Sequence, residues 1–196
     1  MYLTKAQIQA LIDSEEMVIR PLLDEGTQLG EITLDLRLGT DFLVSFQGRG
    51  AYIDAANPNA TPPLKNFFEP TRRRMGQTFL LHPNQTVLCS SLEYIKLPEN
   101  VFAVLNMRSS YARLGLSLAT IVQPGYSGCF SIELTNVNNN PIQLRVGTRL
   151  FQSRFFQASE ATAYFKGKRK YVCQVRPIVS RADVDEELFL LQRIGK

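Results

Sequence analysis

The feature that most constrains this chain is a series of short β-prone runs between residues 77 and 156. Turn signals such as His82-Pro83-Asn84 and Pro98-Glu99-Asn100 separate these runs. Many short strands at nearly even spacing are typical of a sandwich or barrel rather than of a parallel α/β sheet. We therefore predict a mainly β fold. Strands are expected over residues 79–81, 86–88, 101–107, 129–137, 142–144 and 149–156.

The N-terminal third adds a helix and a longer strand. Thr4 followed by Gln7 has the capping-box spacing, and apolar residues then recur at helical intervals, which predicts a helix over residues 5–13. Residues 32–38 alternate between apolar and polar, which predicts a half-buried strand closed by Gly39. Residues 48–76 are rich in Gly and Pro. We expect loops and short strands there.

Composition limits the core and the partners. With 196 residues, 44% of them hydrophobic, the chain can bury one substantial core, so we expect a single domain over residues 1–196. A net charge of +4 suits a small anionic ligand better than a nucleic acid. Apolar runs stay below the roughly 18–20 residues of a membrane-spanning helix, and three scattered cysteines indicate a reducing compartment. We expect a cytoplasmic protein with no membrane partner.

The C-terminal tail, residues 160–196, has a different character. Basic residues cluster between positions 166 and 170, and Ser180 precedes an acidic and apolar run at 184–191 that predicts a terminal helix. We expect the tail to close over a ligand or to dock on a neighbouring subunit.

One polar cluster directly follows the predicted strand at 101–107. It consists of Arg108, Ser109, Ser110 and Arg113. Guanidinium groups and hydroxyls at a strand end can grip phosphate oxygens. A polar turn with solvated arginines explains the same residues equally simply.

A carboxylate and an aromatic ring are further candidates. Strand alternation puts Glu133 on the face opposite Ile132 and Leu134, toward either water or a polar cleft. In a cleft, Glu133 could move protons as a general acid and base; otherwise it is a solvated strand residue. Tyr126 lies in a turn between Gly125 and Gly128, where its ring could stack on a sugar or base, or simply pack.

Missing motifs exclude several nucleotide chemistries. The sequence contains neither the H-x-E with P-C-x-x-C of zinc-dependent base deaminases nor the G-x-x-x-x-G-K-[ST] and G-x-G-x-x-G phosphate loops. The sole histidine, His82, leaves no ordinary His-based triad. We expect no metal ligands from the protein. The run Arg72-Arg73-Arg74 is interpreted as a solvated or subunit-contact patch.

Taken in order, the motifs resemble those of the dCTP deaminase family, within the dUTPase-like superfamily. Each run is short, but the resemblance covers almost the whole chain and the runs occur in the family's order. They are residues 33–39, 81–83, 92–98, 108–116, 124–128, 132–136, 170–174 and 180–183.

The resemblance implies a distorted dUTPase-like β-barrel or jelly roll, with short helices at the N-terminus and in the C-terminal tail. It also implies a homotrimer with active sites between subunits, which converts dCTP to dUTP and ammonia without zinc and with Mg²⁺ on the triphosphate. Glu133 would be the proton shuttle. The nucleotide would be bound by Arg108, Ser109, Ser110, Arg113, Ala119, Gln123, Tyr126, Tyr164, Lys170 and Gln174.

The segment 117–123 departs from the family pattern. It is shorter than usual and lacks the usual His and Thr-Ala run, so Ala119 is the match for the alanine whose backbone meets the base. Gln123 stands where Asp is usual, and an amide cannot act as a base at neutral pH. Because that Asp is the dUTPase base, the sequence favours deamination. The alternatives are an altered deoxynucleotide-binding or regulatory relative, and a dUTP diphosphatase or bifunctional deaminase-diphosphatase.

Overall fold

The computed structural model describes residues 1–46, 48, 50–55, 57, 59–167, 169–184 and 194. Its α-helices, strands and 3₁₀ helices (η) follow one another as α1 (Lys5–Asp13), β1 (Val18–Arg20), α2 (Glu25–Gln28), β2 (Leu34–Ser45), η1 (Leu64–Phe67), β3 (Phe68–Arg72), β4 (Thr78–Leu81), β5 (Thr86–Lys96), β6 (Val101–Met107), α3 (Ser109–Ala112), β7 (Leu116–Ser117), β8 (Thr120–Val122), β9 (Ser127–Asn136), β10 (Ile142–Arg145), β11 (Arg149–Gln157), η2 (Tyr164–Lys166) and η3 (Ala182–Val184).

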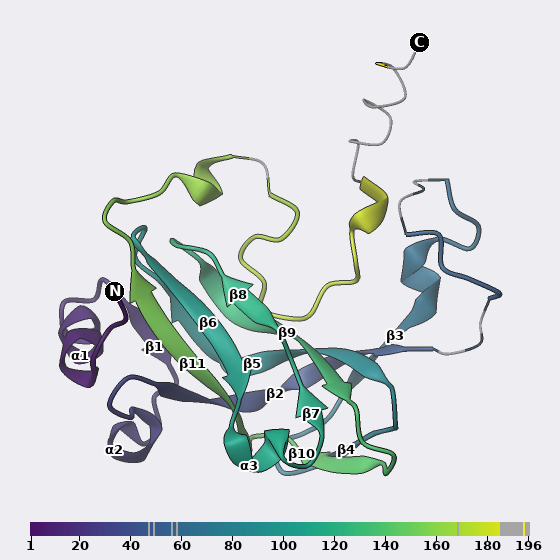
Figure 1. Ribbon diagram of the computed structural model, residues 1–196, viewed down its shortest axis with the longest axis horizontal. Coiled ribbons are helices and arrows are strands. Elements are labelled where there is room, and N and C mark those ends of the chain that lie inside the picture. The colour runs from purple at the N-terminus through teal and green to yellow at the C-terminus, as the bar shows by residue number, and fades with distance from the viewer. Residues whose placement is uncertain are drawn as a thin grey trace.

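The strands curl into a half-barrel, as Figure 1 shows. Within the described residues, a nine-stranded sheet has the order β7-β9-β5-β2-β11-β6-β8, with β1 paired to β5 and β3 paired to β2. Strands β4 and β10 form a separate two-stranded sheet. The pairs β2–β11, β5–β9 and β6–β8 are all antiparallel. The mainly β prediction is confirmed.

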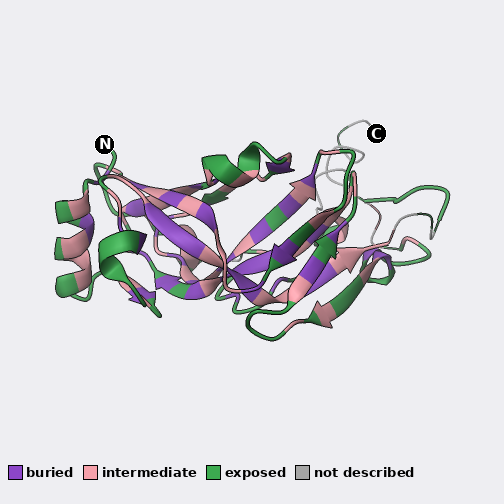
Figure 2. Cartoon of the chain, turned by 90° about the horizontal axis from the view of Figure 1, so that it is seen from below, coloured by how far each residue is buried: buried purple, intermediate pink, exposed green. Residues whose placement is uncertain are grey.

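The core fills the concave side of the half-barrel. Buried and more exposed residues alternate along the strands in Figure 2, as expected for a sheet with one face on the core. Phe130, Phe151 and Phe155 are fully buried. The rings of Phe42 and Phe79 stack with centroids 4.4 Å apart, which packs β4 onto β2. One contiguous core therefore ties the small sheet to the large one.

An ion pair is buried between β2 and β5. Arg37 Nη1 lies 3.0 Å from Glu93 Oε1, and the Glu93 side chain is fully buried. The Arg37 N–H donates to Glu93 Oε2 (2.9 Å) and Gln28 Nε2 donates to Oε1 (3.0 Å). Burial raises the pKa of the Glu93 carboxyl, and the hydrogen bonds from Arg37 oppose that rise. The pair fixes the position of β2 against β5.

Sequence periodicity located several elements closely. Helix α1 covers the predicted residues 5–13, and the Thr4 N–H donates to Gln7 Oε1 (2.9 Å) as the capping pattern requires. Strand β6 has the predicted bounds. Strand β5 is longer than expected, since it continues to Lys96. The short strands β7 and β8 were not predicted.

The prediction that Gly39 closes its strand is wrong. Strand β2 continues through Gly39 to Ser45, with a register shift against β5 between Leu38 and Phe42. A Cβ at Gly39 would lie 2.8 Å from the Ser90 carbonyl oxygen. Glycine is required here because the β5 backbone approaches closely, and not because the chain turns.

The tail leaves β11 and arches over the ends of β6 and β8 (Figure 1). Its described helices are the short η2 and η3, which agrees with the expectation of short helices in the tail. The helix predicted over 184–191 lies outside the described residues, apart from Val184 at the end of η3. None of the described helices has the length and apolar character needed to cross a membrane.

Candidate active site

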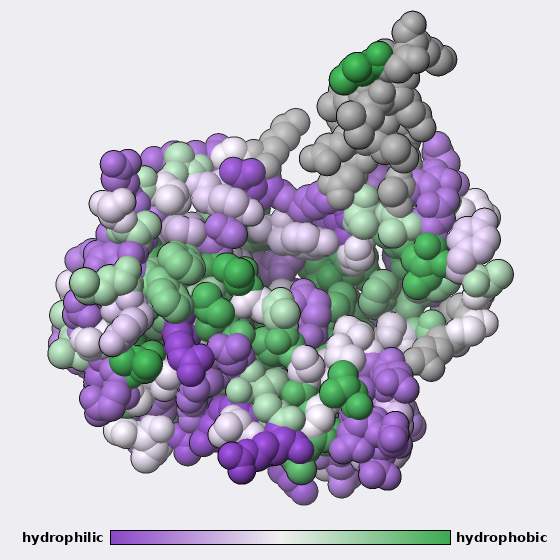
Figure 3. Space-filling view, in the orientation of Figure 1, coloured by the Kyte–Doolittle hydropathy of each residue, from purple (hydrophilic) through white to green (hydrophobic). Residues whose placement is uncertain are grey.

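A cavity of about 650 Å³ lies between the sheet and the tail. In Figure 3 the surface is hollowed beneath the tail, with hydrophobic residues on its floor. The lining comes from β3, β5, β8, β9 and the tail: Phe68, Leu88, Thr120, Ile121, Val122, Gln123, Tyr126, Ser131, Glu133, Tyr164, Phe165, Arg169, Lys170, Tyr171, Gln174, Ile178 and Ser180.

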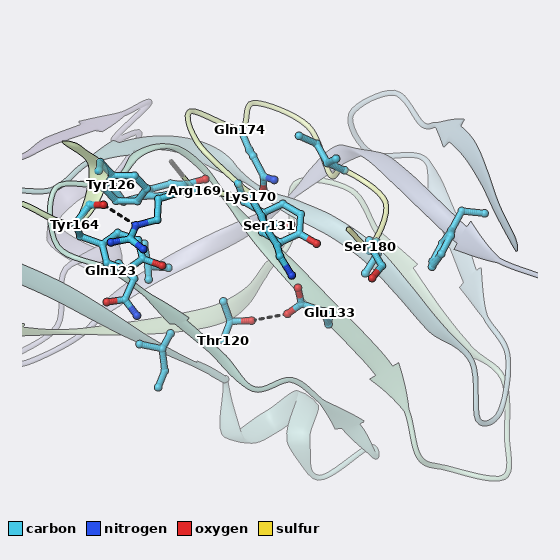
Figure 4. A pocket seen from close by; sticks show the side chains of 17 residues that line it. Thr120, Gln123, Tyr126, Ser131, Glu133, Tyr164, Arg169, Lys170, Gln174 and Ser180 are labelled. Atoms are coloured by element: carbon cyan, nitrogen blue, oxygen red, sulfur yellow. Dashed lines mark hydrogen bonds between the residues drawn. The ribbon is translucent and has the colours of Figure 1, made fainter. Parts of the chain in front are cut away.

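Glu133 faces this cavity from β9. Alternation along β9 buries Ile132 and Leu134 and leaves Glu133 exposed on the other face. Its Oε2 accepts a hydrogen bond from Thr120 Oγ1 at 3.1 Å, as Figure 4 shows. No other Asp or Glu occurs among the described lining residues. The site therefore has one carboxylate, held by a hydroxyl donor, that can exchange a proton with a bound molecule.

Tyr126 forms a fixed wall of the cavity. Only 7% of the residue is exposed, and its hydroxyl donates to the Cys129 carbonyl at 2.6 Å. The ring packs at 5.7 Å from Phe130 and at 6.0 Å from Phe165, both between ring centroids. Burial raises the pKa of the Tyr126 hydroxyl, so that it remains a neutral donor. Tyr126 can limit the space beside a ligand but cannot swing to meet one.

The tail is fastened to β9 at Gln174. This residue is buried, and its carbonyl accepts from the Cys129 N–H at 2.7 Å. A Cβ at Gly128 would lie 3.0 Å from the Gln174 nitrogen, so glycine permits this approach. Several tail residues line the cavity, and closure of residues 160–196 over a ligand or on a neighbouring subunit stays a prediction. The lining residues of the tail are Tyr164, Phe165, Arg169, Lys170, Tyr171, Gln174, Ile178 and Ser180.

Two tail cations reach the cavity. The Arg169 guanidinium carbon lies 4.1 Å from the centroid of the Tyr164 ring, and Arg169 Nε donates to the Tyr164 carbonyl at 2.7 Å. Lys170 lines the cavity beside it. In Figure 4 Arg169 and Tyr164 lie on the side of Gln123 and Tyr126, whereas Lys170 lies nearer the middle, beside Ser131 and above Glu133. These two cations suit an anionic ligand.

The structure brings six of the predicted site residues into one cavity. They are Gln123, Tyr126, Glu133, Tyr164, Lys170 and Gln174. Residues that the sequence analysis did not select also line it. Among these, Arg169 belongs to the basic cluster noted in the sequence. Thr120 was not selected, because its three-residue strand is too short to show an alternating pattern in the sequence.

The remaining predicted residues do not line this cavity in the described structure. Arg108, Ser109, Ser110 and Arg113 lie at or in α3, at the end of β6 away from the tail (Figure 1). Arg108 Nε pairs with Asp35 Oδ2 at 3.1 Å, while Ser109, Ser110 and Arg113 are exposed.

Ala119 also lies outside the lining in the described structure, although the next residue, Thr120, belongs to it. Its side chain is exposed. Nor do the described residues gather three His, Cys, Asp or Glu side chains in a cluster that could hold a metal ion.

The fold and the cavity define a mainly β protein with a hollow between its sheet and its cationic tail, a shape and charge that suit a small anionic ligand. The structure resembles that of 2′-deoxycytidine 5′-triphosphate deaminase from Agrobacterium tumefaciens, with a TM-score of 0.59 and 24% identity over 79% of this chain and 46% of that one. Residues 2–158 match the family described as dCTP deaminase-like. The chain belongs to this dCTP deaminase-like family.

Individual relatives agree with this assignment. The chain is 35% identical to the "dCTP deaminase, dUMP-forming" of Dictyoglomus thermophilum, over 94% of this chain and 96% of that protein. It is 33% identical to the "dCTP deaminase" of Natronomonas pharaonis, over 95% of this chain and 97% of that protein. The likeness therefore includes the tail as well as the sheet.

Proposed function

We propose that this protein deaminates dCTP, with Glu133 as the proton shuttle. The observation that carries the proposal is the position of Glu133. It is the only carboxylate among the described lining residues, it accepts a hydrogen bond from Thr120, and it faces the cavity between the sheet and the cationic tail. Membership of the dCTP deaminase-like family supports the choice of substrate.

The reaction consumes one water and releases one ammonia. Glu133 takes a proton from the water whose oxygen adds to C4 of cytosine, and gives that proton to N3 of the ring. The hydroxyl on C4 then loses its proton through Glu133 to the departing amino group. The C4–N4 bond breaks and the C4 carbonyl of dUTP forms. One carboxylate is sufficient because it accepts and donates in turn.

The product is dUTP rather than dUMP in this proposal. Names among the relatives include both "dCTP deaminase" and "dCTP deaminase, dUMP-forming". Cleavage of the triphosphate would need a second base to activate water, and Gln123 provides an amide at the position where Asp is usual. In this proposal Glu133 transfers protons at C4 and does not serve as the base for triphosphate cleavage.

Arg169, beside Tyr164, and Lys170, nearer the middle of the cavity, would bind the phosphates in this proposal. Oxygens of the bound triphosphate would hold Mg²⁺ with few protein ligands, and the ion would neutralise part of the phosphate charge. Tyr126 bounds the deoxyribose, and its fixed ring leaves little room for a 2′-hydroxyl.

The Arg108 to Arg113 cluster completes the site from a neighbouring subunit of a homotrimer. Its exposed Ser109, Ser110 and Arg113 lie outside the cavity of their own chain. Mixing subunits tests this arrangement. Arg113→Ala and Glu133→Gln proteins should each be inactive, and a refolded equal mixture should regain about a quarter of the sites, because a ring interface joins different patches of two subunits. Absence of recovery in the mixture contradicts a shared site.

The function itself is tested by following ammonia and pyrophosphate together, with each deoxynucleoside triphosphate and Mg²⁺. Ammonia from dCTP without pyrophosphate is the expected result. Pyrophosphate from dUTP would instead identify a diphosphatase or a bifunctional enzyme. Nucleotide binding without either product would identify a binding or regulatory relative and overturn the proposal.

A further inference from the structure

The cavity continues past Glu133 on the side away from Gln123. Strand β8, with Thr120, and the adjoining Gln123 lie on one side of Glu133, and strands β5, β2 and β3 follow on the other. In Figure 4 Glu133 lies between Gln123 and Ser180. The cavity is therefore larger than a carboxylate and a sugar subsite require.

This further part of the cavity has an apolar wall. Leu88 on β5 is the direct cross-strand partner of Glu133, so the two side chains stand on the same face about 4.5–5.5 Å apart at Cβ. Phe68 begins β3, Ile178 belongs to the tail, and both line the same cavity. These three side chains carry no hydrogen-bonding group, so this wall favours an apolar part of the ligand.

Cytosine has one edge that suits this wall. The sugar is attached at N1, and C4 lies across the ring from N1. With the sugar beside Tyr126 and C4 at Glu133, the ring lies between these two residues, and its C4 end borders the further part of the cavity. The neighbours of C4 are N3, which needs a polar partner, and C5, which does not. The C5 edge is the one that matches Leu88.

We propose that the wall formed by Leu88, Phe68 and Ile178 receives an alkyl substituent on C5, so that 5-methyl-dCTP is preferred over dCTP. The inference rests on the proposed function, since it places C4 at Glu133. A buried methyl group contributes about 0.8 kcal/mol, which corresponds to about a fourfold preference.

Steady-state kinetics of ammonia release test the preference. We expect kcat/KM for 5-methyl-dCTP to exceed that for dCTP about fourfold, and 5-hydroxymethyl-dCTP, which brings a hydroxyl to the apolar wall, to fall below 5-methyl-dCTP. A value for 5-methyl-dCTP equal to or below that for dCTP overturns the proposal.

Variants locate the effect. Leu88→Thr and, separately, Ile178→Thr should remove the preference, while Leu80→Thr, an exposed leucine of β4 outside this cavity, should retain it. Ile178 is itself exposed, so its variant folds even if Leu88→Thr does not. A preference retained in both cavity variants contradicts the assignment of the wall.

Binding separates this inference from the proposed function. If neither nucleotide releases ammonia, the proposed function fails, and calorimetric titration of the same protein with each nucleotide still compares their affinities. Tighter binding of 5-methyl-dCTP supports the wall. Equal or weaker binding overturns it.

Discussion

Thr120 Oγ1 donates a hydrogen bond to Glu133 Oε2 across the opening of the half-barrel. Strand β8, which carries Thr120, ends one side of the sheet order, and β9, which carries Glu133, is next to last on the other. The contact therefore joins two strands that are distant in the sheet and adjacent in space. The Glu133 carboxylate is therefore oriented by a residue of β8, a strand that is not hydrogen-bonded to β9 in the sheet.

Replacing Glu133 with Gln should abolish deamination and preserve binding. General acid and base catalysis typically contributes about 10²–10⁴-fold, and we expect a loss of at least this size in kcat for dCTP. Calorimetry should show an affinity for dCTP within a few-fold of that of the original protein. Glu69→Gln, on the exposed strand β3, is the matched control. Unchanged turnover in Glu133→Gln would rule out the proton shuttle.

Thr120→Val should slow the reaction without unfolding the protein. Hydrogen bonds to charged groups contribute roughly 1.5–3 kcal/mol when protected from water; because Glu133 is exposed, we expect the lower end, roughly a tenfold fall in kcat. Thr120→Ser retains a hydroxyl and should retain most of the activity. Rates for the two variants and their melting temperatures provide the comparison, and equal kcat values for Val and Ser would count against an orienting role.

Gly128→Ala should release the tail from the sheet. An added Cβ would lie 2.9 Å from the Tyr126 hydroxyl and 3.0 Å from the Gln174 nitrogen. We expect faster tryptic cleavage within residues 166–176 and a KM for dCTP raised roughly tenfold. Gly167→Ala is the control, since nothing lies within 4 Å of its Cβ. Identical cleavage and KM in both variants would show that the tail does not depend on Gly128.

Arg37→Met should destabilise the protein in a pH-dependent way. Removing one partner of a buried ion pair lowers the free energy of unfolding by roughly 3–5 kcal/mol. In this variant Glu93 remains buried without Arg37. Burial raises the folded pKa of Glu93 above its ordinary 4.5, and the hydrogen bonds and charge of Arg37 lower it, so the variant should raise it further.

The sign of the pH effect follows from linkage. A carboxyl whose pKa is raised in the folded state contributes most to the free energy of unfolding below about pH 4.5. This stabilising contribution is lost as the pH rises through the folded pKa. Urea unfolding from about pH 4.5 to 8 should show a growing deficit for Arg37→Met. Arg72→Met, whose ion pair with Asp41 is largely exposed on the arginine side, should change stability by less than about 0.5 kcal/mol. A deficit that shrinks with rising pH would contradict this account.

Local patterns predicted much of the fold. Residues 5–13 and 101–107 have a clear period, and both elements have the predicted bounds. Gly39 misled the prediction because a glycine that permits close strand approach has the same sequence signal as one that permits a turn. The three residues of β8 are held by pairing with β6, a long-range contact that no local pattern encodes.

The sequence motifs also selected part of the cavity lining. Glu133, Gln174 and Lys170 were selected from ordered motifs, and the structure places them around one cavity. Thr120 and Leu88 were not selected, because their importance depends on which strands face or adjoin β9. The position of a residue in the sequence does not show which strands will be adjacent in the fold.

The half-barrel has a further consequence for how the protein fails under stress. Strand β8, which carries Thr120, pairs with β6 through three residues, whereas Glu133 lies on the ten-residue strand β9. A small outward movement of that short strand would part the two walls of the cavity and leave the backbone ladder almost intact. Catalysis should therefore disappear at a lower temperature than circular dichroism of the sheet, so that loss of turnover gives the earliest warning of thermal damage.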